Sequence, residues 1–192
     1  MIVLGISGAS GIILSYLLLE KLTSAGERVA LVMTKDASLS AHIELGPLFA
    51  TAEKMKAQLP AESQALVSVH HIHDFMAPIA SGSHITKGMI IAPCSMASLA
   101  AIAVGLSDNL LRRAADVTIK EGRKLVVVPR ETPMSVIHLE NQLKLAKMGV
   151  TIFPPLPAWY ALPKTLREAE ELMCDRIIDQ FGIHLPSKRW GN

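Results

Sequence analysis

The sequence predicts an α/β fold in which a parallel sheet lies between layers of helices. Strand-like and helix-like segments alternate from one end of the chain to the other, a pattern typical of parallel sheets covered on both faces. The expected strands are short runs of branched apolar residues bounded by glycine, proline or charge, as buried parallel strands are. The 192 residues contain no linker, repeat or low-complexity segment, so they are expected to form one domain, residues 1–192.

Strand-like runs alternate with amphipathic runs in a regular order. Strands are expected at residues 2–6, 28–33, 67–69, 88–92, 125–128 and 150–153. Helices are expected at residues 12–24, 95–105, 108–122, 133–148 and 165–182, with one or two more between residues 46 and 74.

Capping side chains mark where helices begin. The expected N-caps are Ser95, Asp108, Thr132 and Thr165. Pro133 is expected as a first helical residue, where its missing N–H costs nothing. Glu168 follows Thr165 at the spacing of a capping box.

Composition excludes several classes of function. Half of the residues are apolar and the formal net charge is only +2, so there is no electrostatic case for binding nucleic acid or a membrane surface. Met1 leads directly into a strand-like run, so no signal peptide is expected, and no apolar run is long enough to span a bilayer. Two distant cysteines give no disulfide framework, and a cytoplasmic protein is expected.

Two compositional features concern metals and assembly. His70, His71 and His73 lie near Asp74, but no second ligand cluster at helical spacing accompanies them, so no metal is expected. The Ala- and Met-rich segment 95–104 has few polar positions, which indicates a surface buried between subunits.

Polar loops follow several of the buried strands. Ser7–Gly11 is a glycine-rich turn that offers backbone N–H groups and a positive helix end to an anion, with Ser10 adding a hydroxyl, although a structural tight turn would look similar. A dinucleotide is not expected, because the G-x-G-x-x-G spacing is absent and Thr34–Lys35 replaces the usual acidic residue. Ser95 again places a hydroxyl at a helix start, whereas Cys94 is expected to be a small buried hydrophobe and not a nucleophile.

Two further segments lie at expected carboxyl ends of strands, where open α/β sheets bind ligands. Arg130 and Glu131 follow the run 125–128; a cation beside an acid suits an anionic substrate that exchanges a proton, although a lone pair of this kind is more often a surface ion pair. The stiff segment Pro154–Tyr160 brings two aromatic residues to the same edge. They would suit a flavin or an allyl group, with simple packing as the alternative.

The helix expected at residues 108–122 carries a charged stripe. Arg113, Asp116 and Lys120 share one face by their i, i+3 and i+4 spacing. The stripe is either a solvated row of salt bridges or a pair of cations presented to a phosphate.

Taken together, these segments resemble the flavin prenyltransferase family of the UbiX type over nearly the whole chain. The matching motifs are GISGASG at 5–11, ASGS at 80–83, PCSM at 93–96, DNLLRRAADV at 108–117, KEGRKLVVVPRETP at 120–133, IHLEN at 137–141, PPLPAWY at 154–160 and RW at 189–190. The block from 108 to 133 is highly specific. The resemblance implies a Rossmann-like, flavodoxin-type three-layer α/β/α fold and a homododecamer with FMN between subunits.

The resemblance also implies an activity. Such a protein attaches the dimethylallyl group of dimethylallyl phosphate to reduced FMN, and the prenylated FMN is used by a UbiD-type decarboxylase. The C-terminal tail, residues 183–192, is then expected to lie over the active site. The KEGRK segment at 120–124 is similar to the subgroup that accompanies phenolic-acid decarboxylases.

The resemblance assigns roles to individual residues. Those expected to bind FMN are Gly8, Ala9, Ser10, Thr34, Ser95, Met96, Ala97, Ser98 and Arg130. Those expected to bind the allyl phosphate are Ser81, Gly82, Arg113, Lys120, Glu131, Tyr160 and Arg176. Those expected to be catalytic are Ser10, Glu44, Lys120, Glu131, Tyr160 and Trp190. Cations would neutralise the departing phosphate without Mg²⁺, aromatic faces would stabilise the allyl cation, and an acid would handle protons.

Two alternatives stay open from the sequence. An FMN-dependent decarboxylase of peptidyl cysteine shares this fold, but it would need a histidine beside the flavin and an Asn-bearing loop, and residues 93–96 offer no Asn. A non-catalytic flavin-binding subunit of a phenolic-acid decarboxylase would have no need of Lys120, Arg130 and Glu131 near a phosphate.

Overall fold

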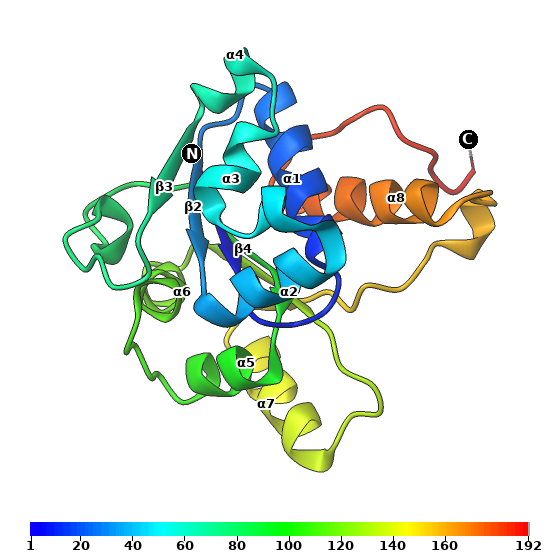
Figure 1. The fold of residues 1–192 in the computed structure, drawn as a ribbon. Coiled ribbons are helices and arrows are strands. Elements are labelled where there is room, and N and C mark those ends of the chain that lie inside the picture. Colours follow the sequence, from blue (N-terminus) through cyan, green and yellow to red (C-terminus); the bar gives the residue numbers. More distant parts are fainter. Residues whose placement is uncertain (192) are drawn as a thin grey trace.

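A six-stranded sheet forms the centre of the computed structural model, which describes residues 1–191 (Figure 1). Its strands are β1 (Ile2–Ile6), β2 (Val29–Met33), β3 (Val67–His70), β4 (Gly88–Cys94), β5 (Lys124–Pro129) and β6 (Thr151–Ile152). All neighbouring strands are parallel, in the order β3-β2-β1-β4-β5-β6. Strands β2 and β3 lie on one side of β1, and the later strands β4, β5 and β6 lie on the other, so the strand order reverses between β1 and β4. Open parallel sheets bind ligands at such a switch point, outside the carboxyl ends of the strands.

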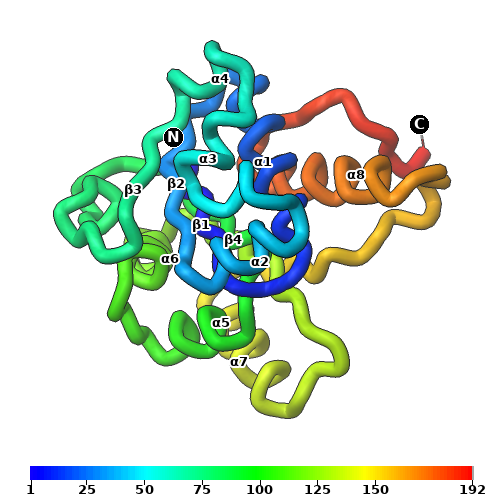
Figure 2. Tube along the Cα trace, viewed as in Figure 1, coloured from blue at the N-terminus to red at the C-terminus, as the bar shows by residue number. Residues whose placement is uncertain are grey.

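Helices cover both faces of the sheet, as Figures 1 and 2 show. One layer contains α1 (Ile12–Ser24), α2 (Lys35–Leu45), α3 (Ala52–Ala57) and α8 (Leu166–Asp179), and the other contains α5 (Met96–Ala103), α6 (Leu110–Lys120) and α7 (Val136–Lys147). The short helix α4 (Ala61–Gln64) and the 3-10 turns Pro47–Phe49, Pro78–Ala80 and Trp159–Ala161 lie in the connections. The predicted three-layer α/β/α fold is therefore confirmed.

The strands pack against both layers because their successive side chains point to opposite faces. In β1, Leu4 packs with the α1 and α8 layer, whereas Val3 packs with the α5 and α6 layer. A Cβ on Gly5 would lie only 3.1 Å from the Leu111 side chain, so this glycine lets α6 approach the sheet closely.

The start of α7 differs from the prediction. Ser135 is the N-cap: its hydroxyl accepts from the His138 N–H (3.3 Å), and the His138 ring accepts from the Ser135 N–H (3.2 Å). These reciprocal bonds satisfy two N–H groups at once. Consequently Thr132 is not the N-cap, Pro133 is not helical, and α7 begins at Val136.

Two other helix starts were predicted wrongly or missed. Asn109, not Asp108, is the N-cap of α6, because the Asn109 amide oxygen accepts from the Arg112 N–H (3.0 Å). The Asp108 carboxylate binds the Arg112 guanidinium instead (2.8 Å). Helix α2 was not predicted, since only two of its residues are buried and its apolar periodicity is weak; Thr34 caps it.

The last helix begins as predicted but without the full capping box. Thr165 accepts from the Glu168 N–H (3.1 Å), which confirms it as the N-cap. The Glu168 carboxylate returns to the Lys164 N–H (2.7 Å), one residue earlier than a capping box requires.

One exposed apolar surface of the chain lies on α7. Its exposed apolar side chains are Val136, Ile137, Leu139 and Leu143, with exposed fractions of 53% to 69%. Leu145 is the one buried residue of this helix. By contrast, the helix at residues 95–104 was expected to be buried between subunits, and most of it packs inside its own chain.

Among residues 1–191, no helix combines the length and the apolar character needed to cross a bilayer. In the same part of the chain, no group of three or more potential metal-ligating side chains comes together.

Candidate functional site

The loops after β1, β4 and β5 meet at the carboxyl edge of the sheet. The Ser95 N–H donates to the Ser7 hydroxyl (2.8 Å), and this hydroxyl donates to the Pro93 carbonyl (3.2 Å). The Arg130 N–H donates to the Cys94 carbonyl (3.2 Å). The structure therefore brings together three of the loops in which FMN-binding residues were expected.

The glycine-rich loop passes directly against the start of α2. A Cβ on Gly8 would overlap the Asp36 Cβ and lie 3.1 Å from the Asp36 carbonyl carbon, so the loop requires glycine at this position. Thr34 stands beside it, because its N–H donates to the Ile6 carbonyl at the end of β1 (3.0 Å). Ser10 is exposed at the tip of the loop. A ligand at the switch point would meet mostly backbone here, which suits an anionic group.

Glu44 fills the start of α1 with its own carboxylate. The carboxylate accepts from the Gly11 N–H (3.0 Å) and from the Ile12 N–H (2.9 Å), where the helix dipole favours an anion. The loop and the start of the helix were expected to offer their N–H groups to a bound anion, and two of these groups, one in the loop and one in α1, are already used by the protein. The same contacts place the Glu44 carboxylate next to Ser10, the residue before Gly11.

The loop after β4 combines a helix cap with an inert thiol. The Ser95 hydroxyl accepts from the Ser98 N–H (3.2 Å), which confirms the predicted N-cap of α5. Met96 and Ala97 follow in the first turn. Cys94 is fully buried, and burial raises the pKa of its thiol to about 12, so it stays protonated at neutral pH. Excluding Cys94 as a nucleophile agrees with this chemistry.

Arg130 and Glu131 line a cavity at the carboxyl ends of β5 and β6. The cavity has a volume of about 500 Å³, within the range of ligand pockets. Its lining residues are Pro129, Arg130, Glu131, Thr132, Met134, Pro154, Pro155 and Leu156. The Glu131 carboxylate accepts from the Thr132 N–H (3.0 Å), and Arg130 is exposed. Both side chains are thus available to a ligand in the cavity.

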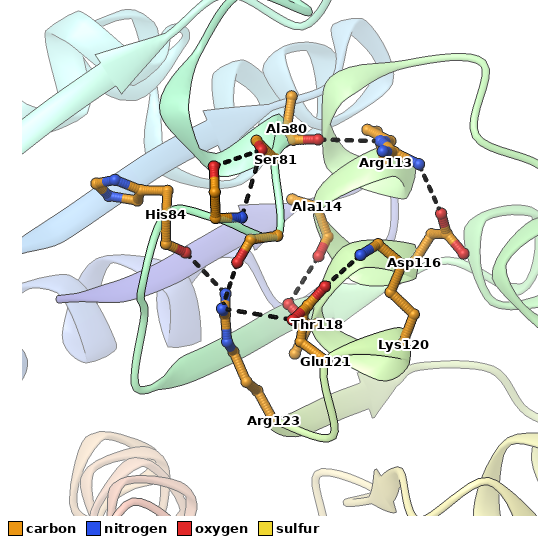
Figure 3. Close-up of polar contacts among 12 residues, drawn as sticks. Ala80, Ser81, His84, Arg113, Ala114, Asp116, Thr118, Lys120, Glu121 and Arg123 are labelled. Carbon is orange, nitrogen blue, oxygen red and sulfur yellow. Dashed lines mark hydrogen bonds and ion pairs between the residues drawn. The ribbon is translucent and has the colours of Figure 1, made fainter.

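A second group of predicted residues gathers around α6 (Figure 3). Arg113 donates from Nε to the Ala80 carbonyl (3.0 Å) and pairs with Asp116 (2.9 Å), while Lys120 forms an ion pair with Glu121. In this structure the charged stripe is therefore a row of salt bridges, which was the first of the two interpretations of the sequence. Each expected phosphate-binding cation has its own acidic partner.

The loop that carries Ser81 and Gly82 is fastened against this stripe. Arg123 donates to the Gly82 carbonyl (2.6 Å) and to the His84 carbonyl (2.8 Å), as Figure 3 shows. The Ser81 hydroxyl lies 2.9 Å from the Ser83 hydroxyl. A Cβ on Gly82 would lie 2.7 Å from the Lys120 ammonium, so loop and stripe are in direct contact.

The two groups lie towards opposite edges of the sheet. α6 ends at Lys120, four residues before β5 begins at Lys124, so Lys120 lies near the amino edge. Arg130 follows the other end of the same strand. Within one chain, the expected phosphate-binding residues on and beside α6 (Ser81, Gly82, Arg113 and Lys120) therefore do not form one site with the expected FMN-binding loops, whereas Glu131 lies beside Arg130 in the cavity.

A third group joins the C-terminal tail to the segment after β6. The rings of Tyr160 and Trp190 meet edge to face, with centroids 5.2 Å apart. Arg176 lies on α8, half exposed, 3.7 Å from the Asp179 carboxylate. Asp179 also binds Arg189 of the tail. The tail thus contacts Tyr160, one of the predicted active-site residues.

Residues that sequence reasoning missed act as supports for these groups. They are Glu121, Arg123 and Asp179. Glu121 pairs with Lys120, and Asp179 follows Arg176 at an i, i+3 spacing that a helical rule detects. Arg123 binds carbonyls some 40 residues away, which no local pattern encodes.

Comparison with known proteins identifies close relatives. A family model described as Flavoprotein matches residues 1–178. The flavin prenyltransferase UbiX of Halalkalibacterium halodurans is 47% identical over 190 residues, which cover 97% of this chain and 91% of that protein. A dodecameric FMN-dependent Ubix-like decarboxylase from Escherichia coli O157:H7 is 42% identical with a TM-score of 0.89, over 100% of this chain and 99% of that one. AnUbiX (PadA1), in complex with FMN and dimethylallyl pyrophosphate, is 38% identical with a TM-score of 0.87, over 100% and 97%.

Proposed function

We propose, since the chain belongs to the flavin prenyltransferase family of the UbiX type, that it transfers the dimethylallyl group of dimethylallyl phosphate to reduced FMN. The observation that carries the proposal is the presence of two distinct groups on one chain. A backbone-lined carboxyl edge with an acid-bearing cavity suits a flavin, and a cation-rich loop and helix suit a phosphate. A passive flavin carrier has no use for the second group.

The carboxyl edge fits FMN by its own geometry. The close passage of Gly8 against Asp36 leaves backbone exposed to the ligand, and the hydroxyls of Ser10 and Ser95 can donate to it. Reduced FMN is the nucleophile of the reaction, and its ring would lie by the cavity that Arg130 and Glu131 line. Thr34 and residues 96–98 would complete the binding surface.

The residues around α6 and α8 would receive the phosphate of the donor. Transfer of an allyl group breaks its carbon–oxygen bond and leaves negative charge on the phosphate, which Arg113, Lys120 and Arg176 would stabilise. Positive charge develops on the allyl fragment at the same time. Tyr160 and Trp190 would face it with their π systems, and enclosure would exclude water.

Glu131 would donate or accept a proton, as a general acid or base, where the flavin and the allyl phosphate meet. Its carboxylate lines the cavity at the end of β5 and is partly buried. A positioned carboxyl group typically contributes about 10²-fold or more as a general acid or base. Glu44, fixed at the start of α1 beside Ser10, would act on the other side of the flavin.

We infer that the complete site forms between copies of the chain. The flavin group and the phosphate group lie towards opposite edges of one sheet, so a neighbouring copy must bring its α6 group to the carboxyl edge. The exposed apolar face of α7 (Val136, Ile137, Leu139 and Leu143) provides a surface for such a contact. A homododecamer, the state of the Escherichia coli relative, would satisfy both requirements.

The product, prenylated FMN, would serve as cofactor of a UbiD-type decarboxylase in the cytoplasm. The KEGRK segment favours a phenolic-acid decarboxylase as the recipient. Cys94 and Cys174 are both free and buried, in keeping with a reducing compartment.

The direct test is incubation with reduced FMN and dimethylallyl phosphate, followed by mass spectrometry of the released flavin. A flavin heavier by one C5H8 unit is expected, and a parallel reaction with dimethylallyl diphosphate measures the preference for the donor. Lys120→Ala should weaken use of the donor far more than binding of FMN. Tight binding of reduced FMN with no heavier flavin from either donor would refute the proposed activity.

A further inference from the structure

Asp179 is the most heavily bonded acid in the described part of the chain. It lies at the end of α8, and its side chain is only 11% exposed. Its two oxygens accept from both terminal nitrogens of Arg189 (2.8 Å each), and one of them lies 3.0 Å from the His184 ring nitrogen. Arg176 approaches the same carboxylate at 3.7 Å.

These contacts fasten the C-terminal tail. Arg189 directly precedes Trp190, whose ring lies edge-on against Tyr160 at 5.2 Å. Lys188 adds a second attachment by donating to the Ala161 carbonyl (3.1 Å). In Figures 1 and 2 the red tail returns beside α8 and ends near the gold segment that contains Tyr160.

Packing alone does not hold the end of the tail. The Trp190 side chain is 80% exposed, so little apolar burial fixes its position. A two-pronged guanidinium–carboxylate pair, in contrast, fixes both distance and orientation. The orientation of the indole therefore depends on the residue before it.

Asp179 lies at the C-terminal end of α8, where the helix dipole disfavours a carboxylate. The C-terminal end of a helix carries partial negative charge, which repels a carboxylate. Hydrogen bonds from Arg189 nevertheless lower the pKa of Asp179 to about 2. The tail thus provides the positive charge that makes this position favourable.

We propose that Asp179 is a positioning residue for prenyl transfer, which latches the tail through Arg189 and so keeps Trp190 against Tyr160. The inference rests on the proposed function, in which these two aromatic side chains flank the allyl group. Asp179 touches neither substrate. Asp179 also holds Arg176 near the tail. The same carboxylate therefore links a cation that is expected to bind the phosphate to the aromatic pair Tyr160 and Trp190.

The test uses the full-length protein with Trp159→Phe, which leaves Trp190 as the single tryptophan. In this background, Asp179→Asn should lower the fluorescence anisotropy of Trp190 in the flavin-free protein. It should reduce kcat/KM for the allyl donor about tenfold, with unchanged FMN affinity, because one charge-assisted contact is lost. Arg189→Gln should reproduce both effects, and it lies beyond the last helix, where it leaves the fold intact.

A double-variant cycle identifies the contact itself. Asp179→Asn combined with Arg189→Gln should be no worse than either single change, since both remove the same interaction. Glu171→Gln is the matched control: Glu171 lies on the same helix and pairs with Arg167 at 3.0 Å, and neither readout should change. Wild-type anisotropy and wild-type kcat/KM in Asp179→Asn would overturn the latch. If the unsubstituted protein makes no prenylated flavin, the proposed function fails, while anisotropy in the Trp159→Phe background still decides the latch.

Discussion

Complementation between two inactive variants tests whether the site is shared between copies of the chain. Glu131→Gln damages the carboxyl edge and Lys120→Ala damages the phosphate group towards the opposite edge. Each variant alone should be slower than wild type by about 10²-fold. In an oligomer that contains both in equal amounts at random, half of the sites receive an intact Glu131, and half of those receive an intact Lys120. About a quarter of wild-type activity should return, as expected for a heterologous contact between identical subunits.

The assay co-expresses the two variants with different affinity tags, isolates mixed oligomers through both tags and measures formation of prenylated FMN. Lys120→Ala mixed with Arg113→Ala is the control, because both changes damage the same group and no site in the mixture is whole. Recovery in the first mixture and none in the second supports a shared site. If the first mixture stays as inactive as its components although both variants occupy the same oligomers, each chain builds its own site and the spatial argument is wrong.

Three further results are expected. Gly82→Ala should raise the KM for the allyl phosphate about tenfold without changing FMN affinity, because its methyl group would collide with the Glu121 carboxylate and displace the Lys120 ammonium that pairs with it, 2.7 Å from the new methyl group; steady-state kinetics and flavin titration check this. The lowered pKa of Asp179 means that its contribution to holding the tail is present above its ordinary value of 3.8 and is lost as the pH falls towards about 2. Anisotropy of Trp190 should therefore hold at pH 4 and drop nearer pH 2, and a transition near pH 5 would contradict this assignment. Cys94 should resist thiol reagents in the folded protein at pH 7 and react after denaturation, as mass spectrometry of the labelled protein would show.

The strands and most of the helices could be predicted because they depend on local composition, whereas α2 was missed. The apolar runs in β1, β2 and β4 are buried along their whole length. Helix starts are harder, since adjacent polar residues compete for the same N–H groups. Asp108 and Asn109 are both good caps, and the choice between them follows from the Arg112 guanidinium, which takes the carboxylate and leaves the amide to the helix.

The candidate site was predictable only in part for a related reason. Residues that follow parallel strands converge on one edge by the geometry of the sheet, so the grouping of the loops at Ser7, Ser95 and Arg130 is a consequence of the fold class. The contact of Gly82 with Lys120 depends on how a long connection packs on a helix, and no periodicity encodes it. The individual residue roles came from family motifs and remain predictions.

The carboxylate of Glu44 at the start of α1 has a consequence for the turnover cycle. In the proposed reaction the flavin is consumed and leaves as product, so the protein must pass through an empty state in every round. A loop that relied on the flavin phosphate to satisfy its N–H groups would lose their partner each time the product departed. Glu44 satisfies the Gly11 and Ile12 N–H groups permanently, and the loop therefore keeps its shape for the next flavin.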